Sequence, residues 1–246
     1  MSEISSNDSA PSLLAHLVAG SSQEELFATR GLAYLLKTAS CNTALLGEMN
    51  KYADQHEHPF ITNVQCRWVE EDGNQGNGRP YVTGYSDGKK RIIIEGKFWS
   101  DLTSNQPVAY LNSLAETSGK DIKNLYTVCI FVVPPSRQAN LWGKIKDRIK
   151  NTPNFRLSEQ DISAENADWN ATRVSIEIGN EIDKRVVSVV LAITNWQCML
   201  NILQYEAVQS TKDDIAQLRA LCERQESSGF REFSEKWSRK IEQRYK

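Results

Sequence analysis

The sequence predicts a single α/β domain in which helices flank a mixed β-sheet, with further helices at both ends. Two apolar runs, Val128–Val133 and Val186–Ile193, have the length and composition of strands that are buried on both faces. A helical segment lies between an earlier apolar strand and the first of these runs, which is the order of a β-α-β crossover. Apolar residues make up 40% and charged residues 24% of the 246 residues, so a sizeable core can form.

The bulk composition excludes several classes of protein. The 29 lysines and arginines nearly balance the 31 aspartates and glutamates, and the formal charge of −2 excludes a globally basic nucleic-acid binder, though not a local basic groove. No apolar run approaches the roughly 18–20 residues that span a bilayer, so we expect no membrane partner. Residues 1–20 lack a signal-peptide pattern and predict a disordered lead. Five cysteines without a C-x-x-C pair argue against a cysteine zinc site and favour a cytoplasmic protein.

Two helices are predicted near the N-terminus. Ser21 or Ser22 can cap a helix over 23–39, whose acidic first turn suits the positive end of the helix dipole. A second helix is predicted over 42–54, where apolar residues recur along one stripe.

Strands follow these helices. Residues 61–70 alternate enough to predict a strand, and the glycine- and asparagine-rich stretch 71–80 predicts a loop. Asp87-Gly88 lies between two β-rich runs, 80–85 and 91–98, and indicates a β-hairpin.

The remaining elements are predicted from caps and apolar runs. Thr103 or Asn105 can cap a helix that has Pro107 in its first turn and ends at Gly119. Residues 159–183 stand out only by their charge, with seven acidic residues and one basic. The other predictions are a buried strand over 125–133, a basic helix over 137–150, a strand over 186–193, a helix over 196–209 capped by Asn195, a helix over 214–226 and a helical tail over 230–246.

A charged pair ends one of the predicted strands. Glu95 and Lys97 are two residues apart, so they share one face of a strand with Ile93. Two charges at the end of a buried strand are costly unless they are paired or functional. A carboxylate there can hold Mg²⁺, and the ammonium can orient a water or stabilise developing negative charge. The alternative is an ion pair at the exposed end of a strand.

The segment IIIEGKFWSDLTSNQPVAYL resembles the motifs of the PD-(D/E)xK nuclease superfamily. Glu95-Gly96-Lys97 matches its E-x-K element, and Gln106-x-x-x-Tyr110 matches the Q-x-x-x-Y helix motif of its RecB-like branch. The segment FATRGLAYLL is similar to the N-terminal helices of bacterial members of unassigned function. The resemblance implies that Glu95 and the carbonyl of Gly96 bind metal, that Lys97 positions or activates water, and that Gln106 and Tyr110 contact substrate or brace the site.

The resemblance covers residues 24–135 and implies a restriction-endonuclease-like core, with a mixed sheet flanked by helices. We expect the domain that contains this core to extend over residues 21–210. The lead, 1–20, would be disordered, and 211–246 would form a helical extension that packs on the same domain.

The sequence departs from the family pattern at two positions. The family usually has an aspartate on the strand before E-x-K, where this chain has Tyr81, and a tyrosine is a poor ligand for Mg²⁺ near neutral pH. Asp87 is the acid nearest to that place, either as a second metal ligand or as a plain turn residue. Many relatives carry a glutamate on the first helix, where the alignment gives Arg30, which would compete with metal for Glu95. Other acids could replace it, although surface solvation is expected for each: Glu24, Glu25, Glu70, Glu71 and Asp72.

Basic residues are grouped in two places. One group lies at the predicted hairpin, and the other lies on the predicted helix 137–150, which carries five basic residues and one acidic residue. Either group could follow a phosphate backbone, or form a solvated surface. The predicted nucleic-acid contacts are Lys89, Lys90, Arg91, Lys144 and Arg148.

These observations support more than one function. The first hypothesis is hydrolysis of DNA or RNA phosphodiesters with Mg²⁺ or Mn²⁺, in bacterial defence if the resemblance extends that far. The second is a catalytically inactive version of the fold that serves as a scaffold, a nucleic-acid-binding subunit or a protein-interaction module. A protein partner or a homodimer is compatible with either.

Overall fold

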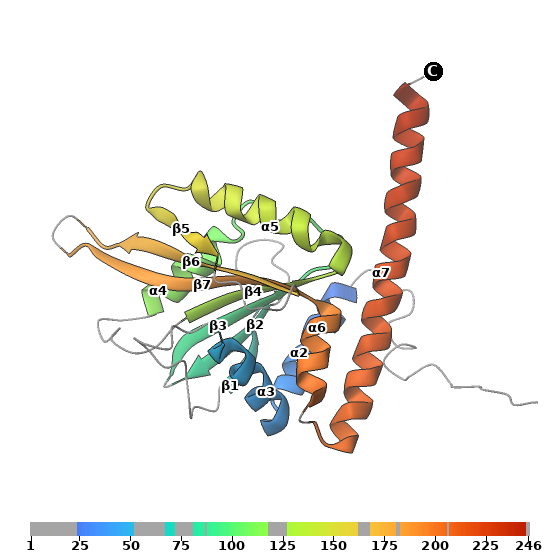
Figure 1. Cartoon of the computed structure of the whole chain (residues 1–246), viewed down its shortest axis with the longest axis horizontal. Helices are drawn as coiled ribbons and strands as arrows, with labels where there is room; N and C mark the ends of the chain where they lie inside the picture. The colour runs from blue at the N-terminus through green and yellow to red at the C-terminus, as the bar shows by residue number, and fades with distance from the viewer. Residues whose placement is uncertain are drawn as a thin grey trace, which may run out of the picture.

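A computed structural model describes residues 24–51, 67–71, 81–86, 88–117, 127–161, 168–180, 183–205 and 207–244. Within these residues, seven strands form one mixed sheet in the order β1-β2-β3-β4-β7-β6-β5 (Figure 1). The strands are β1 (Arg67–Glu71), β2 (Tyr81–Ser86), β3 (Lys89–Gly96), β4 (Thr127–Val133), β5 (Phe155–Asp161), β6 (Trp169–Ile178) and β7 (Arg185–Asn195). The predicted α/β class, a mixed sheet flanked by helices, is confirmed.

The pairing of the strands divides the sheet into three parts. β1, β2 and β3 are consecutive antiparallel neighbours. The central strands β3, β4 and β7 are parallel, and β6 and β5 continue the sheet in antiparallel fashion. The predicted hairpin is present, since β2 pairs with β3 and Gly88 between them has a φ of 70°. Asp87 lies outside the described residues.

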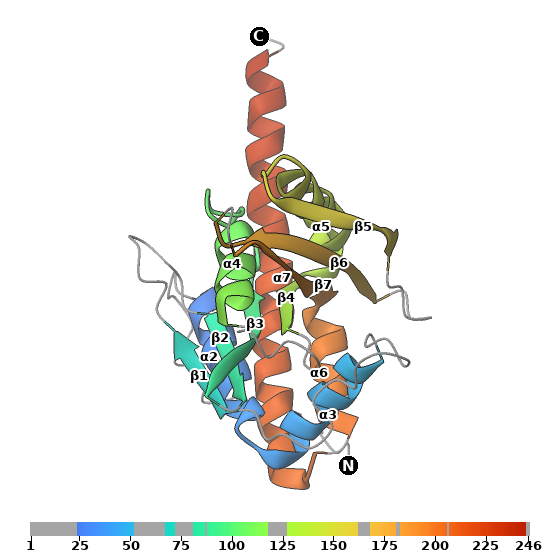
Figure 2. The same cartoon turned by 90° about the vertical axis from the view of Figure 1, so that its left-hand side faces the viewer.

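Helices cover both faces of the sheet (Figures 1 and 2). One face is covered by α4 and α5, and the other by α2, α3, α6 and α7. Their bounds are α2 (Glu24–Leu36), α3 (Ala39–Asn50), α4 (Val108–Thr117), α5 (Pro135–Lys150), α6 (Trp196–Tyr205) and α7 (Gln209–Arg244).

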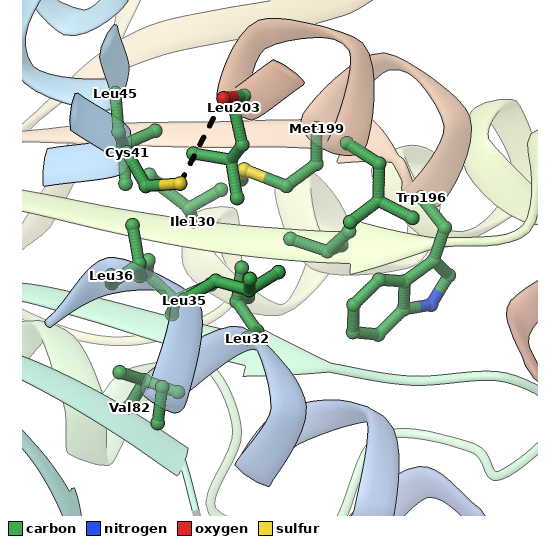
Figure 3. Close-up of a cluster of buried hydrophobic side chains, with 14 of the residues drawn as sticks. Leu32, Leu35, Leu36, Cys41, Leu45, Val82, Ile130, Trp196, Met199 and Leu203 are labelled. Carbon is green, nitrogen blue, oxygen red and sulfur yellow. Dashed lines mark hydrogen bonds between the residues drawn. The ribbon is translucent and has the colours of Figure 1, made fainter. Parts of the chain in front are cut away.

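The two faces form two apolar clusters that the sheet separates. All seven residues of β4 are buried, and its side chains alternate between the clusters, as predicted for a strand covered on both sides. Ile130 lies in the cluster beneath α2, α3 and α6, where Cys41 Sγ lies 3.8 Å from the carbonyl oxygen of Leu203 (Figure 3). Phe131 lies in the opposite cluster, beneath α4 and α5.

Some elements differ from the sequence predictions. Residues 155–161 and 169–178 form strands β5 and β6, which the sequence did not predict. In β6, Val174 and Ile176 are buried and alternate with half-buried polar residues, so a period-2 pattern was present. The predicted helix 214–226 and the predicted tail belong to one helix, α7.

No helix among the described residues is both long enough and apolar enough to cross a membrane.

Candidate functional site

Glu95 lies near the carboxyl end of β3, beside the parallel strand β4. It is 1% exposed and stands opposite Phe131 in the β3–β4 register. The Gln106 side-chain amide donates to Glu95 Oε1 at 2.9 Å, and the Tyr110 hydroxyl donates to Oε2 at 2.8 Å. The same amide nitrogen of Gln106 lies 2.7 Å from the Tyr110 oxygen. Both carboxylate oxygens of Glu95 therefore accept a bond from residues that the sequence placed in the site.

Lys97, the residue directly after β3, completes this group. Its side chain is as buried as that of Glu95, and its Nζ lies 3.3 Å from Glu95 Oε1. Nζ also donates to Ser100 Oγ at 3.4 Å. Both main-chain polar groups of Lys97 are hydrogen-bonded: its amide donates to the Val132 carbonyl, and its carbonyl accepts from the Trp196 indole. The pair is therefore buried, rather than an ion pair at an exposed strand end.

The electrostatics of the site are dominated by burial. Burial raises the pKa of Glu95, although the charge of Lys97 and the hydrogen bonds from Tyr110 and Gln106 act in the opposite direction. Burial, reinforced by the Glu95 charge, also raises the pKa of Tyr110 and that of the nearby Cys129 thiol. Tyr110 therefore stays a protonated donor, whereas burial favours the protonated form of Glu95.

Gln106 and Tyr110 meet by a different geometry from the one predicted. The predicted helix, capped by Thr103 or Asn105, includes both residues, but α4 begins at Val108, and Gln106 lies in the turn before it. The Gln106 amide donates to the Thr103 carbonyl, and its side-chain oxygen accepts from the Thr103 amide. These two bonds close a small ring that points the side-chain nitrogen of Gln106 at Glu95 and Tyr110.

Glu25 of α2 is one of the five acids that the sequence offers as a replacement for the glutamate of the family's first helix. Its predicted environment is solvent, but it is 9% exposed. Its carboxylate accepts from the amides of Phe98 and Ser100 at 2.8 and 3.2 Å, and the Ser100 hydroxyl lies 2.8 Å from both of its oxygens. Since Ser100 also accepts from Lys97, a polar chain runs from Glu25 through Ser100 and Lys97 to Glu95.

No local pattern identifies Glu25, because 73 residues separate it from Phe98. Its place in the first turn of a helix is fully explained by the helix dipole. Arg30, which was expected to compete with a metal for Glu95, is exposed. The α2 acid that joins the polar chain is Glu25. The Glu95 carboxylate accepts its bonds from Gln106, Tyr110 and Lys97.

The predicted nucleic-acid contacts fall into two distant groups. Lys89 begins β3, so at 3.3 Å per residue it lies about 20 Å from Glu95 along the strand. Lys89 and Lys90 are half-buried, and Arg91 is 5% exposed.

The second group lies on α5, close to the site. Lys144 forms an ion pair of 3.0 Å with Asp101, and Arg148 donates to backbone carbonyls just before α4. Both side chains therefore contact the segment that leads from Lys97 to Gln106.

The oxygen atoms of the site decide whether it could hold a divalent metal. Mg²⁺ prefers oxygen ligands and is commonly held by one or two carboxylates together with water and substrate phosphates. Glu95 supplies one carboxylate, and Glu25 supplies a second acid at the other end of the polar chain. Among the described residues, no three histidine, cysteine or acidic side chains form a metal-binding group. A divalent metal at this place would have Glu95 as its protein carboxylate, and water and a substrate phosphate would have to supply its other ligands. The side chains of Tyr81 and Asp87 lie outside the described residues.

Comparison with known proteins adds no family. No family model matches the chain, and no curated protein matches it. Among solved structures, the chain is similar to a GTP pyrophosphokinase family protein from Streptococcus pneumoniae, with 13% identity over 55% of this chain and 76% of that one. The TM-score of 0.28 is too low for this likeness to support a fold or a function.

Proposed function

We propose that the chain is a metal-dependent nuclease of the PD-(D/E)xK type, which hydrolyses phosphodiester bonds of DNA or RNA. The observation that carries the proposal is the buried Glu95–Lys97 pair at the end of a central strand, with Gln106 and Tyr110 both bonded to Glu95. Burying two charges costs several kcal/mol per ion before they are compensated, roughly as large as the net stability of many domains. Such a cost is expected where the charges perform chemistry.

The proposal includes a restriction-endonuclease-like core around this pair. Three observations support it: α2 precedes three antiparallel strands, Glu95 lies one residue before the end of the third, and α4 leads from β3 to its parallel neighbour β4. This order puts the E-x-K strand between a hairpin and a crossover, and both Gln106 and Tyr110 come from the segment that makes the crossover.

The chemistry follows from the charges and donors of the site. A bound Mg²⁺ or Mn²⁺ would polarise the phosphoryl oxygens and acidify a water, with Glu95 as its protein ligand. Lys97 brings a positive charge to the same place, where it orients the attacking water and stabilises the charge that develops on the phosphate. Gln106 and Tyr110 fix the Glu95 carboxylate, because both of its oxygens accept a bond from them. Ser100 and Glu25 hold the Lys97 ammonium from the other side.

Cleavage of DNA and RNA by the parent protein and by Glu95→Gln tests the proposal. The parent should cleave with Mg²⁺ or Mn²⁺ and not with EDTA. Glu95→Gln should lose about 100-fold or more of the rate, the typical effect of losing one charged group from a preorganised site. Because burial raises the pKa of Glu95, protons compete with metal for the carboxylate, and the parent rate should rise with pH through that raised value.

Glu48→Gln is the matched control. Glu48 is 9% exposed, against 1% for Glu95, and pairs with a lysine, Lys51, at 2.5 Å. It belongs to α3, and this pair includes none of the site residues. Its substitution should therefore leave the rate within about twofold. Metal-dependent cleavage that persists in Glu95→Gln would refute the proposed site.

A second candidate function is an inactive subunit of the same fold that binds nucleic acid. The finding that favours it is the single carboxylate at the centre of the site, since no group of three metal-binding side chains occurs in the described part of the chain. It predicts that the parent binds DNA or RNA with a steep salt dependence and never cleaves either, with any divalent metal.

A further inference from the structure

Residues 98–107, which follow Lys97 and lead to α4, hold two site residues and contain no helix or strand. We call this segment the connection. It contributes Ser100, which links Lys97 to Glu25, and Gln106, which bonds to Glu95. The carbonyls of Thr103, Asn105 and Pro107 accept from backbone amides. Carbonyls of the segment that do not accept from a backbone amide must be satisfied in another way. The geometry of the site therefore depends on whatever holds these carbonyls.

Arg148, in the last turn of α5, holds the second half of the connection. Its Nη1 donates to the carbonyls of Thr103 and Gln106, the latter at 2.6 Å. Its Nη2 donates to the Leu102 carbonyl at 3.3 Å. One guanidinium thus donates to three carbonyls, which lie on both sides of the turn that orients the Gln106 side chain toward Glu95.

Arg137, in the first turn of the same helix, holds the first half. Its Nη1 donates to the carbonyls of Phe98 and Ser100 at 2.6 and 2.9 Å. Its Nη2 lies 3.4 Å from Asp101 Oδ1, which also pairs with Lys144. The two carbonyls flank Trp99, within the same stretch whose amides donate to Glu25.

The helix that carries these arginines is rigidly seated. Leu141, Trp142, Ile145 and Ile149 of α5 are buried in the cluster on this face of the sheet. A packed helix is a better support for a site than an irregular segment.

We propose that Arg137 and Arg148 are positioning residues, which fix the connection so that Ser100 and Gln106 reach the Glu95–Lys97 pair. We call these two arginines the clamp, because they bind the backbone carbonyls of the connection and not a phosphate. That the clamp supports cleavage rests on the proposed function, whereas the contacts of the clamp do not.

The choice of arginine over lysine follows from the geometry. A guanidinium presents a planar fork of donors, which can bridge carbonyls that point in from different directions. A lysine carries the same charge but a single nitrogen, so it cannot span the Leu102, Thr103 and Gln106 carbonyls in the same way. Arg148→Lys therefore separates the clamp from a simple attraction of phosphates, which needs only the charge.

Hydrogen exchange tests the clamp without any reference to activity. In Arg148→Gln and Arg148→Lys, the amides of Thr103 and Gln106 should exchange about 10-fold faster or more, because the turn loses bonds from a charged donor. Lys150→Gln is the matched control: it removes one charge from the exposed end of the same helix, and exchange in 98–107 should not change. Amides of β4 should keep their protection in all three variants, which shows that the fold is intact. Unchanged exchange at Thr103 and Gln106 in an intact Arg148→Gln protein would overturn the proposal.

Kinetics then connect the clamp to the site. If the parent cleaves, Arg148→Lys should lower kcat at least 10-fold while the salt dependence of nucleic-acid binding stays at the parent value. A weaker affinity with a smaller salt slope, restored by lysine, would instead make Arg148 a phosphate contact and overturn the proposal. If the parent never cleaves but exchange rises in the Arg148 variants, the clamp stands and the proposed function fails.

Discussion

Gly96 lies between the two charged residues of the site, and its lack of a side chain lets neighbouring helices pack closely against β3. Glu95 and Lys97 point to one face of β3, so a side chain at position 96 would point to the other. A Cβ there would lie 2.8 Å from Thr29 Oγ1 of α2 and 2.8 Å from Cζ2 of Trp196, whose ring is fully buried. Glycine therefore lets two helices approach the strand directly behind the site, and the Trp196 indole can donate to the Lys97 carbonyl.

At this scale we expect Gly96→Ala to lower the free energy of unfolding by about 1–3 kcal/mol, the usual cost of overpacking a core. Urea unfolding followed by circular dichroism measures it. Gly143→Ala is the control, because a Cβ at that position in α5 meets nothing within 4 Å. It should raise stability by about 0.5–1 kcal/mol, since alanine is the better helix former. Equal stability of Gly96→Ala and the parent would contradict the close approach.

At the scale of elements, the site depends on how α6 starts directly after β7. Asn195 ends the strand, and its side-chain oxygen accepts from the Cys198 amide at 2.8 Å, which is an N-cap. Its side-chain nitrogen lies 3.2 Å from Gln138 Oε1 of α5. One residue thus begins α6, which carries Trp196, and also contacts the helix that holds the connection.

Asn195→Ala should destabilise the protein by about 1–2 kcal/mol, because the cap acceptor is lost from a buried helix start. Asn195→Ser keeps an acceptor of the right kind and should recover part of this loss. Thermal unfolding of the three proteins gives the comparison. If alanine and serine were both as stable as the parent, the cap would not be an important contact.

At the scale of the whole molecule, one sheet separates two apolar clusters that share every central strand. Cys41 lies in the cluster beneath α2, α3 and α6, and Cys129 lies in the cluster beneath α4 and α5. Neither side chain is exposed, and burial raises the pKa of both thiols. Both should therefore be inert to alkylation while the sheet is intact.

We expect Cys41 and Cys129 to become reactive at the same urea concentration, because loss of the shared sheet opens both clusters together. Pulse alkylation with peptide mapping measures each thiol, and the part-exposed Cys198 should react first, as an internal reference. Reaction of Cys129 at a clearly lower urea concentration would show that the face carrying α4 and α5 opens independently.

The sequence alone predicted the features that depend on neighbouring residues. Alternation and apolar runs located β3, β4 and β7, Asp87-Gly88 marked the hairpin, and Asn195 marked the start of α6. The two-residue period of a strand is also sufficient to place Glu95 and Lys97 on one face. In β6 an alternating pattern existed, but the acidic charge of residues 159–183 hid it.

Only the tertiary structure decided how the site is completed. Glu25 reaches Ser100 across 75 positions of the chain, and Arg148 reaches Gln106 across 42, and no short sequence pattern records such a distance. The same holds for the basic residues of α5: the sequence shows how many charges the helix carries, but it does not show which residues they contact. Local spacing fixes which way a side chain points, whereas the packing of the helices on the sheet fixes what it meets.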